Sequence, residues 1–212
     1  MLKISKAKLI ITSIVILIPM AVGLILWNQL PEEMVTHWGV GNVPDGWSNK
    51  AVTVFGLPAF LLIIHWVCLI ATKADPKSKN INPKVMNLVL WICPLISLLV
   101  LTATYAYALG HDINVEIIVN IFIGVLFVII GNYLPKCKQS YTVGIKLPWT
   151  LNDEENWNKT HRLGGILWVV SGIIMIVTAL FSNAVINIIV IVTAIVVPTV
   201  YSYVLYRKKL NK

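Results

Sequence analysis

Six long apolar windows constrain the fold of this chain more than any other feature. An α-helix needs about 20 mostly apolar residues to cross a bilayer. Charged residues make up only 12% of the 212 residues, about half the share of an ordinary soluble domain. The windows are Leu9–Leu30, Ala51–Thr72, Val85–Leu109, Val115–Leu134, Gly165–Ser182 and Val185–Tyr206. The sequence therefore predicts an all-α polytopic membrane protein with six transmembrane helices.

The lysines and arginines predict how these helices are oriented. Sixteen of the 17 fall in the N-terminal tail, the second loop, the fourth loop or the C-terminal tail, and only Lys50 lies in a loop on the other side. Because cytoplasmic loops carry the excess of positive charge, we expect both termini to be cytoplasmic. The same juxtamembrane clusters, facing anionic lipid, account for the net charge of +8. The lipid bilayer is thus an expected partner, and direct binding to nucleic acid is not.

The loop between the first two windows, residues 31–50, is a candidate extracellular site. It contains two tryptophans and the turn pattern Val43-Pro44-Asp45-Gly46, which predicts an ordered loop packed on the bilayer surface. The alternative is that both tryptophans only anchor the chain at the interface. Acidic residues and His37 could also form a metal site, but their spacing is not typical of one, and we predict no metal. The candidate ligand-binding residues are His37, Trp38, Asp45, Gly46 and Trp47.

An ionisable residue, His65, lies deep within the second window. No Asp, Glu, Lys or Arg lies in the middle of any window, so the sequence offers no chain of charged groups that could relay ions or protons. We therefore expect a neutral His65 that is hydrogen-bonded across a helix interface. Gly124 in the fourth window also suits close contact between helices.

The longest interval without an apolar run is the loop of residues 135–163, which ends in the signals of a short helix. Thr150 and Asn152 are both candidate N-caps, each with an acidic residue three positions later. We expect this helix to lie along the membrane interface, with the rings of Trp149 and Trp157 at headgroup depth. The next membrane helix would then begin at Gly164–Gly165, where the chain packs closely or bends.

Three motifs around this loop resemble the SdpI family of multi-pass bacterial membrane proteins. They are GNYLPK at 131–136, the Tyr-x-Val-Gly-Ile-Lys-x-Pro-Trp-Thr run at 141–150 and WNKTHRLGG at 157–165. Residues 30–50 resemble an uncharacterised N-terminal module that accompanies the family. The expected organisation is a two-helix module at 9–72 that includes the loop 31–50, a third helix at 85–109, and an SdpI-like module at 115–206 that includes the loop 135–163.

The resemblance implies an immunity protein of the bacterial cell membrane. Members of the family protect their cell from a secreted, sporulation-delaying peptide toxin. They also signal by holding a small cytoplasmic DNA-binding autorepressor at the membrane. By this resemblance, the partners are an extracellular toxic peptide and such a repressor. The candidate residues for docking the repressor are Lys146, Trp149, Thr150, Trp157, Lys159, Thr160, His161 and Arg162.

Other function classes fit less well. The chain has no phosphate-binding loop, no His-Glu-x-x-His motif and no Gly-x-Ser-x-Gly motif. Thr160 and His161 are adjacent, and adjacent residues on a helix do not face each other. We therefore expect neither an enzyme nor a cofactor. A small-molecule or peptide transporter is disfavoured by the lack of buried charges, and a purely structural subunit would leave the helix signals of the loop 135–163 without a purpose.

Overall fold

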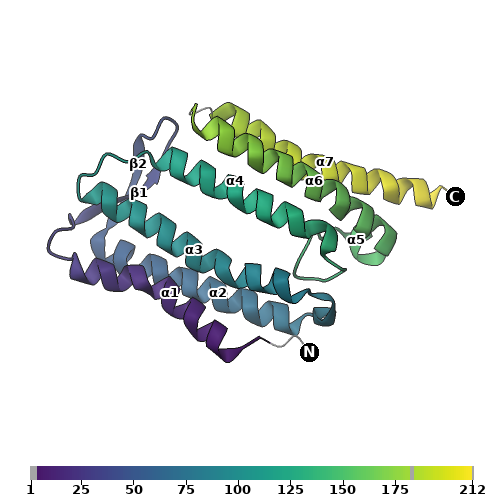
Figure 1. Cartoon of the computed structure of the whole chain (residues 1–212), viewed down its shortest axis with the longest axis horizontal. Helices are drawn as coiled ribbons and strands as arrows, with labels where there is room; N and C mark the ends of the chain where they lie inside the picture. The colour runs from purple at the N-terminus through teal and green to yellow at the C-terminus, as the bar shows by residue number, and fades with distance from the viewer. Residues whose placement is uncertain (1–3, 182–183, 212) are drawn as a thin grey trace. The chain divides into compact units, whose positions relative to one another are not determined.

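The computed structural model describes residues 4–181 and 184–211 and is mostly helical. In this part of the chain, six helices are long and apolar enough to cross a membrane, which confirms the predicted number. The long helices are α1 (Lys6–Ile25), α2 (Leu57–Ala74), α3 (Pro83–Ala108), α4 (Val115–Tyr133), α6 (Glu154–Ala179) and α7 (Ala184–Leu210) (Figure 1). The shorter elements are β1 (Glu33–Trp38), β2 (Pro44–Asn49), a π-helix at Val52–Gly56, 3-10 turns at Ser78–Asn80 and Leu134–Lys136, and α5 (Pro148–Asn152).

The chain divides into two compact units. Among the described residues, the hairpin unit comprises residues 4–73 and Met86–Val115, and so contains α1, both strands, α2 and most of α3. The loop unit comprises Ala74–Val85 and the chain from Glu116 onward, with α4 to α7. The third membrane helix, expected as a separate segment, therefore belongs to the same unit as the first two.

Side chains of α3 hold α1 in the hairpin unit. Pro19 lies inside α1, and proline removes one backbone hydrogen bond from a helix. Ser97 donates to the carbonyl of Ile16 at 2.8 Å, and Tyr105 donates to the carbonyl of Pro19 at 3.0 Å. His65 on α2 lies 3.1 Å from the hydroxyl of Thr12 on α1, which confirms the predicted hydrogen bond across a helix interface.

The loop 31–50 is ordered as predicted, but as a two-stranded antiparallel sheet that the all-α prediction did not include. The predicted turn at Val43-Pro44-Asp45-Gly46 is wrong, because Pro44 to Gly46 belong to β2. The chain instead reverses through Gly41 and Asn42, which both have positive φ angles. Glycine and asparagine tolerate that conformation better than other residues do, and proline is acceptable at the start of an edge strand.

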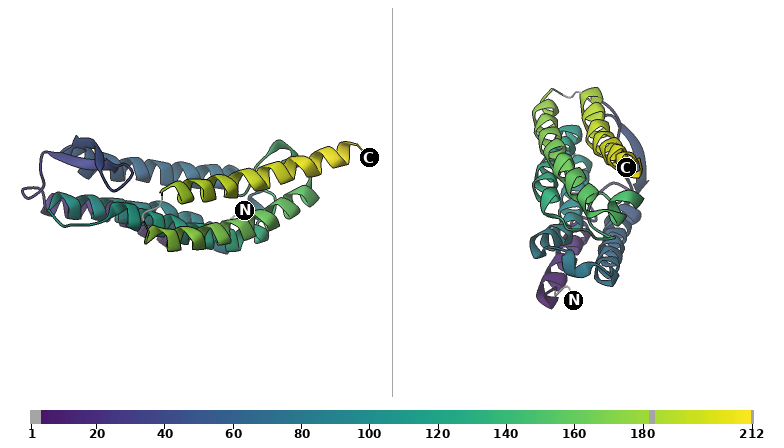
Figure 2. Two further views of the ribbon diagram at one scale, coloured as in Figure 1. Left: turned by 90° about the horizontal axis from the view of Figure 1, so that it is seen from above. Right: turned by 90° about the vertical axis from the view of Figure 1, so that its right-hand side faces the viewer.

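Two pairs of glycines bring α4 and α6 together in the loop unit. A Cβ atom added at Gly124 would lie 2.8 Å from the carbonyl oxygen of Gly172, and one at Gly131 would lie 2.8 Å from that of Gly165. The two glycines on each helix are seven residues apart, so they share one stripe of each helix. The predicted role of Gly124 in helix packing is confirmed. On its other side α6 runs beside α7, as both views of Figure 2 show.

The predicted short helix and fifth membrane helix are one continuous helix, α6. The predicted start of a separate membrane helix at Gly164–Gly165 is wrong, but the predicted close packing there is confirmed, because both glycines are buried against the end of α4 and the turn after it. The predicted N-caps, Thr150 and Asn152, lie in α5 instead. Asp153 is the N-cap of α6, and its carboxylate accepts from the backbone of Glu155 and Asn156. The predicted end of the fifth membrane helix at Ser182 lies outside the described residues.

Candidate functional site

The hairpin presents three of its five predicted site residues on one exposed face. The side chains of His37 and Asp45 are 72% and 50% exposed and form an ion pair, and Trp47 is 56% exposed. Gly46 leaves room for His37, because a Cβ atom at Gly46 would lie 2.8 Å from that of His37. Trp38 is separate from them: its ring packs edge-on against Tyr107, with centroids 5.6 Å apart. The exposed group can contact a ligand, and Trp38 fixes the hairpin to α3.

Lys50, at the end of the hairpin, is buried rather than exposed. Its ammonium group donates to the carbonyls of Trp27 and Leu30 and to the carboxylate of Glu32, at 2.8–3.3 Å. It also lies 4.7 Å from the centre of the Trp27 ring. No other lysine or arginine occurs between Trp27 and Lys50. The charged groups that the hairpin exposes are therefore acidic, apart from His37.

In the loop unit, the residues of the signature motifs form a buried, hydrogen-bonded core. The rings of Trp157 and His161 stack with centroids 3.9 Å apart, and both side chains have no exposed area. The indole of Trp157 donates to the carbonyl of Cys137 at 2.7 Å. Nε2 of His161 accepts from the backbone N–H of Ile145 at 2.8 Å, and Nδ1 lies 2.8 Å from the carbonyl of Trp157. This arrangement requires a neutral imidazole with its proton on Nδ1.

Gly144 allows this stacking. Its φ angle is +117°, and a Cβ atom there would lie 2.5 Å from Nε2 of His161 and 2.8 Å from the ring of Trp157. Any larger residue at this position would be strained and would collide with the stacked rings. The same burial raises the pKa of the neighbouring Cys137 thiol to about 11, which leaves it unreactive at neutral pH.

A second group of hydrogen bonds connects α7 to α6 and to α5. Asn156 donates to the carbonyl of Ser202, and the hydroxyls of Ser202 and Thr160 both donate to its side-chain oxygen, all at 2.9 Å. The indole of Trp149 donates to the Ser202 hydroxyl at 2.6 Å. Thr150 closes the preceding turn, since its hydroxyl accepts from the N–H of Leu147 at 2.9 Å. These polar residues are satisfied by one another and have a structural role.

Asp75 joins the loop after α2 to the loop after α4 and was not among the predicted site residues. Its carboxylate is 4% exposed and accepts from the backbone of Tyr141 and Thr142, the hydroxyl of Thr142 and the backbone of Lys77, at 2.7–3.1 Å. The only local signal is the Asp75-Pro76 pair that follows α2, which is typical of a turn. Tyr141 and Thr142 lie more than 60 residues away, and no sequence pattern indicates them.

The structure therefore separates the predicted docking residues into two groups. Thr150, Trp157, Thr160 and His161 are buried and cannot contact a partner. The Trp157 ring is enclosed by protein and makes no contact with its surroundings outside the chain. Lys146, Lys159 and Arg162 are exposed, and Trp149 is half-buried.

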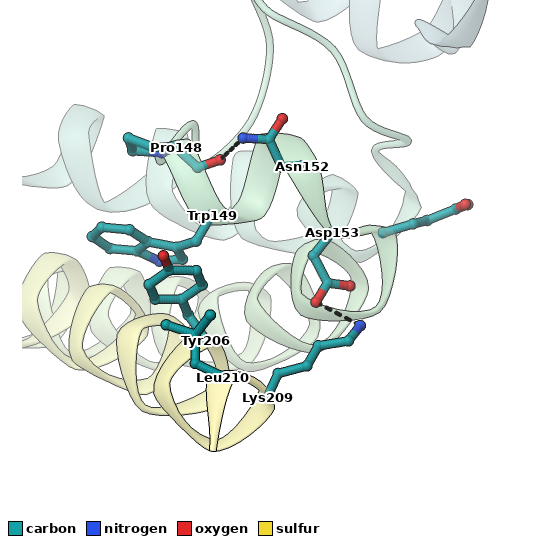
Figure 3. Close-up of a pocket in the computed structure, with 8 residues that line it drawn as sticks. Pro148, Trp149, Asn152, Asp153, Tyr206, Lys209 and Leu210 are labelled. Carbon is teal, nitrogen blue, oxygen red and sulfur yellow. Dashed lines mark hydrogen bonds and ion pairs between the residues drawn. The ribbon is translucent and has the colours of Figure 1, made fainter. Parts of the chain in front are cut away.

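The exposed residues of α5, the start of α6 and the end of α7 surround a pocket of about 420 Å³ (Figure 3). Trp149 and Tyr206 stack along one side, with centroids 5.8 Å apart. Lys209 spans the pocket to Asp153 at 2.9 Å, and its hydrogen bond lowers the pKa of that carboxyl. A second pocket of about 290 Å³ shares this ion pair and is also lined by Glu155, Lys159 and Lys208, among others. In the part of the chain that the structure describes, no three His, Cys, Asp or Glu side chains gather into a metal site.

Comparison with known proteins finds two family models that match parts of the chain. Residues 136–202 match the SdpI/YfhL protein family, and residues 14–62 match a domain of unknown function, DUF1648. The chain is 32% identical to the Immunity protein SdpI of Bacillus subtilis (strain 168), over 96% of this chain and 98% of that protein. No solved structure matches the chain.

Proposed function

The chain belongs to the SdpI family, and from this premise we propose that it protects its bacterium against a secreted toxic peptide. The observation that carries the proposal is the identity to an immunity protein over almost the full length of both chains. The chain is a multi-pass protein of the cell membrane with six apolar helices. It can therefore act where such a peptide meets the cell.

The hairpin is the part of the chain that we assign to the peptide. The 16-to-1 division of lysine and arginine supports its placement outside the cell. Trp47 offers a flat apolar surface, and Asp45 beside it adds negative charge. A peptide with apolar and basic residues would find both contacts on one face.

The test is protection of a sensitive strain by hairpin variants. We expect a Trp38→Ala, Asp45→Asn, Trp47→Ala triple variant to lose protection at an unchanged membrane level. An Asp45→Asn, Trp47→Ala double variant keeps the packing of Trp38 against Tyr107 and should also lose most of it. Val40→Ala is the matched control, since Val40 is an exposed apolar residue of the turn. Full protection by the triple variant would exclude the hairpin from the peptide site.

The finer part of the proposal is signalling by recruitment of a small cytoplasmic autorepressor. Four exposed or half-buried residues support a docking surface at the cytoplasmic end of the loop unit: Lys146, Trp149, Lys159 and Arg162. The pocket beside Trp149 gives this surface a recess for an apolar side chain of the partner. The buried core of Trp157, His161 and Asn156 holds the surface in shape. Reversal of the exposed charges, described at the end of the Discussion, tests this part separately.

A further inference from the structure

The pairing of β1 and β2 determines which backbone groups point away from the hairpin. The N–H of Lys50 donates to the carbonyl of Glu32, so these two residues form a hydrogen-bonded pair. In an antiparallel sheet hydrogen-bonded pairs alternate with non-hydrogen-bonded pairs, whose N–H and C=O groups point outward. The register pairs Glu33 with Asn49 and Val35 with Trp47. Both are therefore non-hydrogen-bonded pairs, and their N–H and C=O groups point outward.

The β2 edge carries an unused set of these groups. Outside the pairing with β1, the described residues form no hydrogen bond to the N–H or C=O of Trp47 or to the N–H of Asn49, while the carbonyl of Asn49 accepts from Thr53. Trp47 and Asn49 are two residues apart, which is the spacing at which an added strand would pair. The side chains of β2 alternate between exposed and half-buried, whereas β1 contains the buried Met34. The residues of β2 are thus more exposed than those of β1.

The hairpin is held in place before any ligand arrives. Met34 packs in a core with Leu30, Val54, Leu101 and Tyr105. At the turn, Asn42 donates to the carbonyl of Ile113 and accepts from the N–H of Val115, at 3.1 and 2.9 Å. A preorganised edge lowers the ordering cost of binding a peptide.

The charge at this end of the unit favours one kind of ligand. Because Lys50 is buried, residues 27–50 and 107–115 expose no lysine or arginine, while Glu33, Asp45 and Asp112 are exposed. Exposed single-sign charge attracts ligands of the opposite sign. A negatively charged segment would be repelled, and a basic one would be attracted.

We propose that the β2 edge captures a positively charged peptide in extended conformation by adding it as a third strand. Main-chain hydrogen bonds to Trp47 and Asn49 supply the pairing, and the Trp47 side chain packs on an apolar residue of the peptide. This inference rests on the proposed immunity function and specifies how the peptide is held. Because the paired groups belong to the backbone, we expect the β2 edge to bind peptides that differ in sequence.

Amide hydrogen exchange of the full-length protein in lipid nanodiscs tests the proposal. The probe is the sporulation-delaying peptide toxin for which the family is named. Strand addition predicts slower exchange at the amides of Trp47 and Asn49 when the peptide is present, with no change at Glu33 and Val35 on the other edge. Protection of a sensitive strain without slower exchange at Trp47 and Asn49 would overturn the strand addition and leave the immunity function standing. Failure of the wild-type protein to protect any sensitive strain would overturn both.

A pair of variants separates the backbone contact from the side chain. Trp47→Ala and Trp47→Pro both remove the indole, but only proline removes the outward N–H. Proline is tolerated on an edge strand where its nitrogen faces solvent, and unchanged slow exchange at Met34 and Ser48 would verify that the hairpin is intact. The loss of one hydrogen bond predicts about fivefold weaker peptide binding by Trp47→Pro than by Trp47→Ala. Equal affinities in the two variants would overturn the proposal.

Discussion

The hairpin and the loop unit use the same three residue types in opposite ways. The hairpin has Trp47, Asp45 and His37, which are exposed and contact mainly one another or solvent. The loop unit has Trp157, Asp75 and His161, which are buried and hydrogen-bonded to backbone groups.

The difference shows that a distinctive motif does not by itself indicate a binding surface. In the loop unit the residues of the family signature satisfy each other's polar groups and fix the chain after α4 against α6. In the hairpin, the analogous residues remain available to a ligand. Burial, rather than residue type, distinguishes the structural motif from the candidate recognition site. Matched substitutions in the two regions should therefore differ in their effect on the free energy of unfolding.

The two tryptophans give the largest expected contrast. Trp157→Ala should lower the free energy of unfolding by about 3–5 kcal/mol, since it leaves a cavity and removes the partner of the Cys137 carbonyl. Trp47→Ala should change it by less than about 0.5 kcal/mol, because the ring is exposed. Denaturant titration of both full-length variants in the same detergent measures the difference. Equal destabilisation would contradict the comparison.

The two aspartates give the next contrast. Asp75→Ala would leave the backbone donors of Lys77, Tyr141 and Thr142 without their acceptor, at a cost of about 3 kcal/mol. It should also expose residues 137–147 to limited proteolysis. Asp45→Ala removes only an exposed ion pair and should cost at most about 1 kcal/mol. Protease resistance of the loop in the Asp75→Ala variant would show that other contacts hold it.

Substitution of the buried histidine should also lower the free energy of unfolding more than substitution of the exposed one, but by a smaller amount. His161→Phe keeps a ring on Trp157 but leaves the N–H of Ile145 without an acceptor, which should cost about 1–3 kcal/mol. His37→Phe should stay within about 0.5 kcal/mol. Amide exchange at Ile145 provides a direct measurement, and it should become faster in His161→Phe alone. An unchanged rate would mean that this hydrogen bond does not protect the loop.

Much of the fold could be predicted because its signals are local. The six membrane helices follow from the length and apolar character of single segments. The grouping of Trp47, Asp45 and His37 follows from one short loop. Each of these inferences needed only neighbouring residues.

The predictions that were wrong depended on contacts between distant segments. Helix α6 continues through Gly164–Gly165 because α4 packs on that stripe, and a glycine pair alone cannot reveal this. Thr150 has the composition of an N-cap, but its hydroxyl closes the turn before α5 instead. Asp75 meets Tyr141 and Thr142 only after folding. In each case, tertiary packing decided between two locally acceptable structures.

The smallest effect on stability is expected from the exposed charges of α6. Lys159 pairs with Glu155 four residues earlier, and Arg162 is exposed one turn further on. A Lys159→Glu, Arg162→Glu variant should lose at most about 1 kcal/mol of stability, because exposed charges contribute little. The same reversal should strongly weaken electrostatic capture of a cytoplasmic partner.

Recovery of the cognate repressor with membranes after exposure to the peptide is the measurement, with protection from the peptide scored in parallel. Lys84→Glu is the matched control, since Lys84 is an exposed lysine at the start of α3 that lines neither pocket and forms no ion pair among the described residues. Docking on α6 predicts that the double variant still protects but no longer recovers the repressor, whereas the control does both. If the double variant recovered the repressor normally, the start of α6 would serve only to brace the loop unit. Both the exposed and the buried face of the start of α6 would then have only a structural role. The hairpin, by contrast, would use its exposed face to contact a ligand.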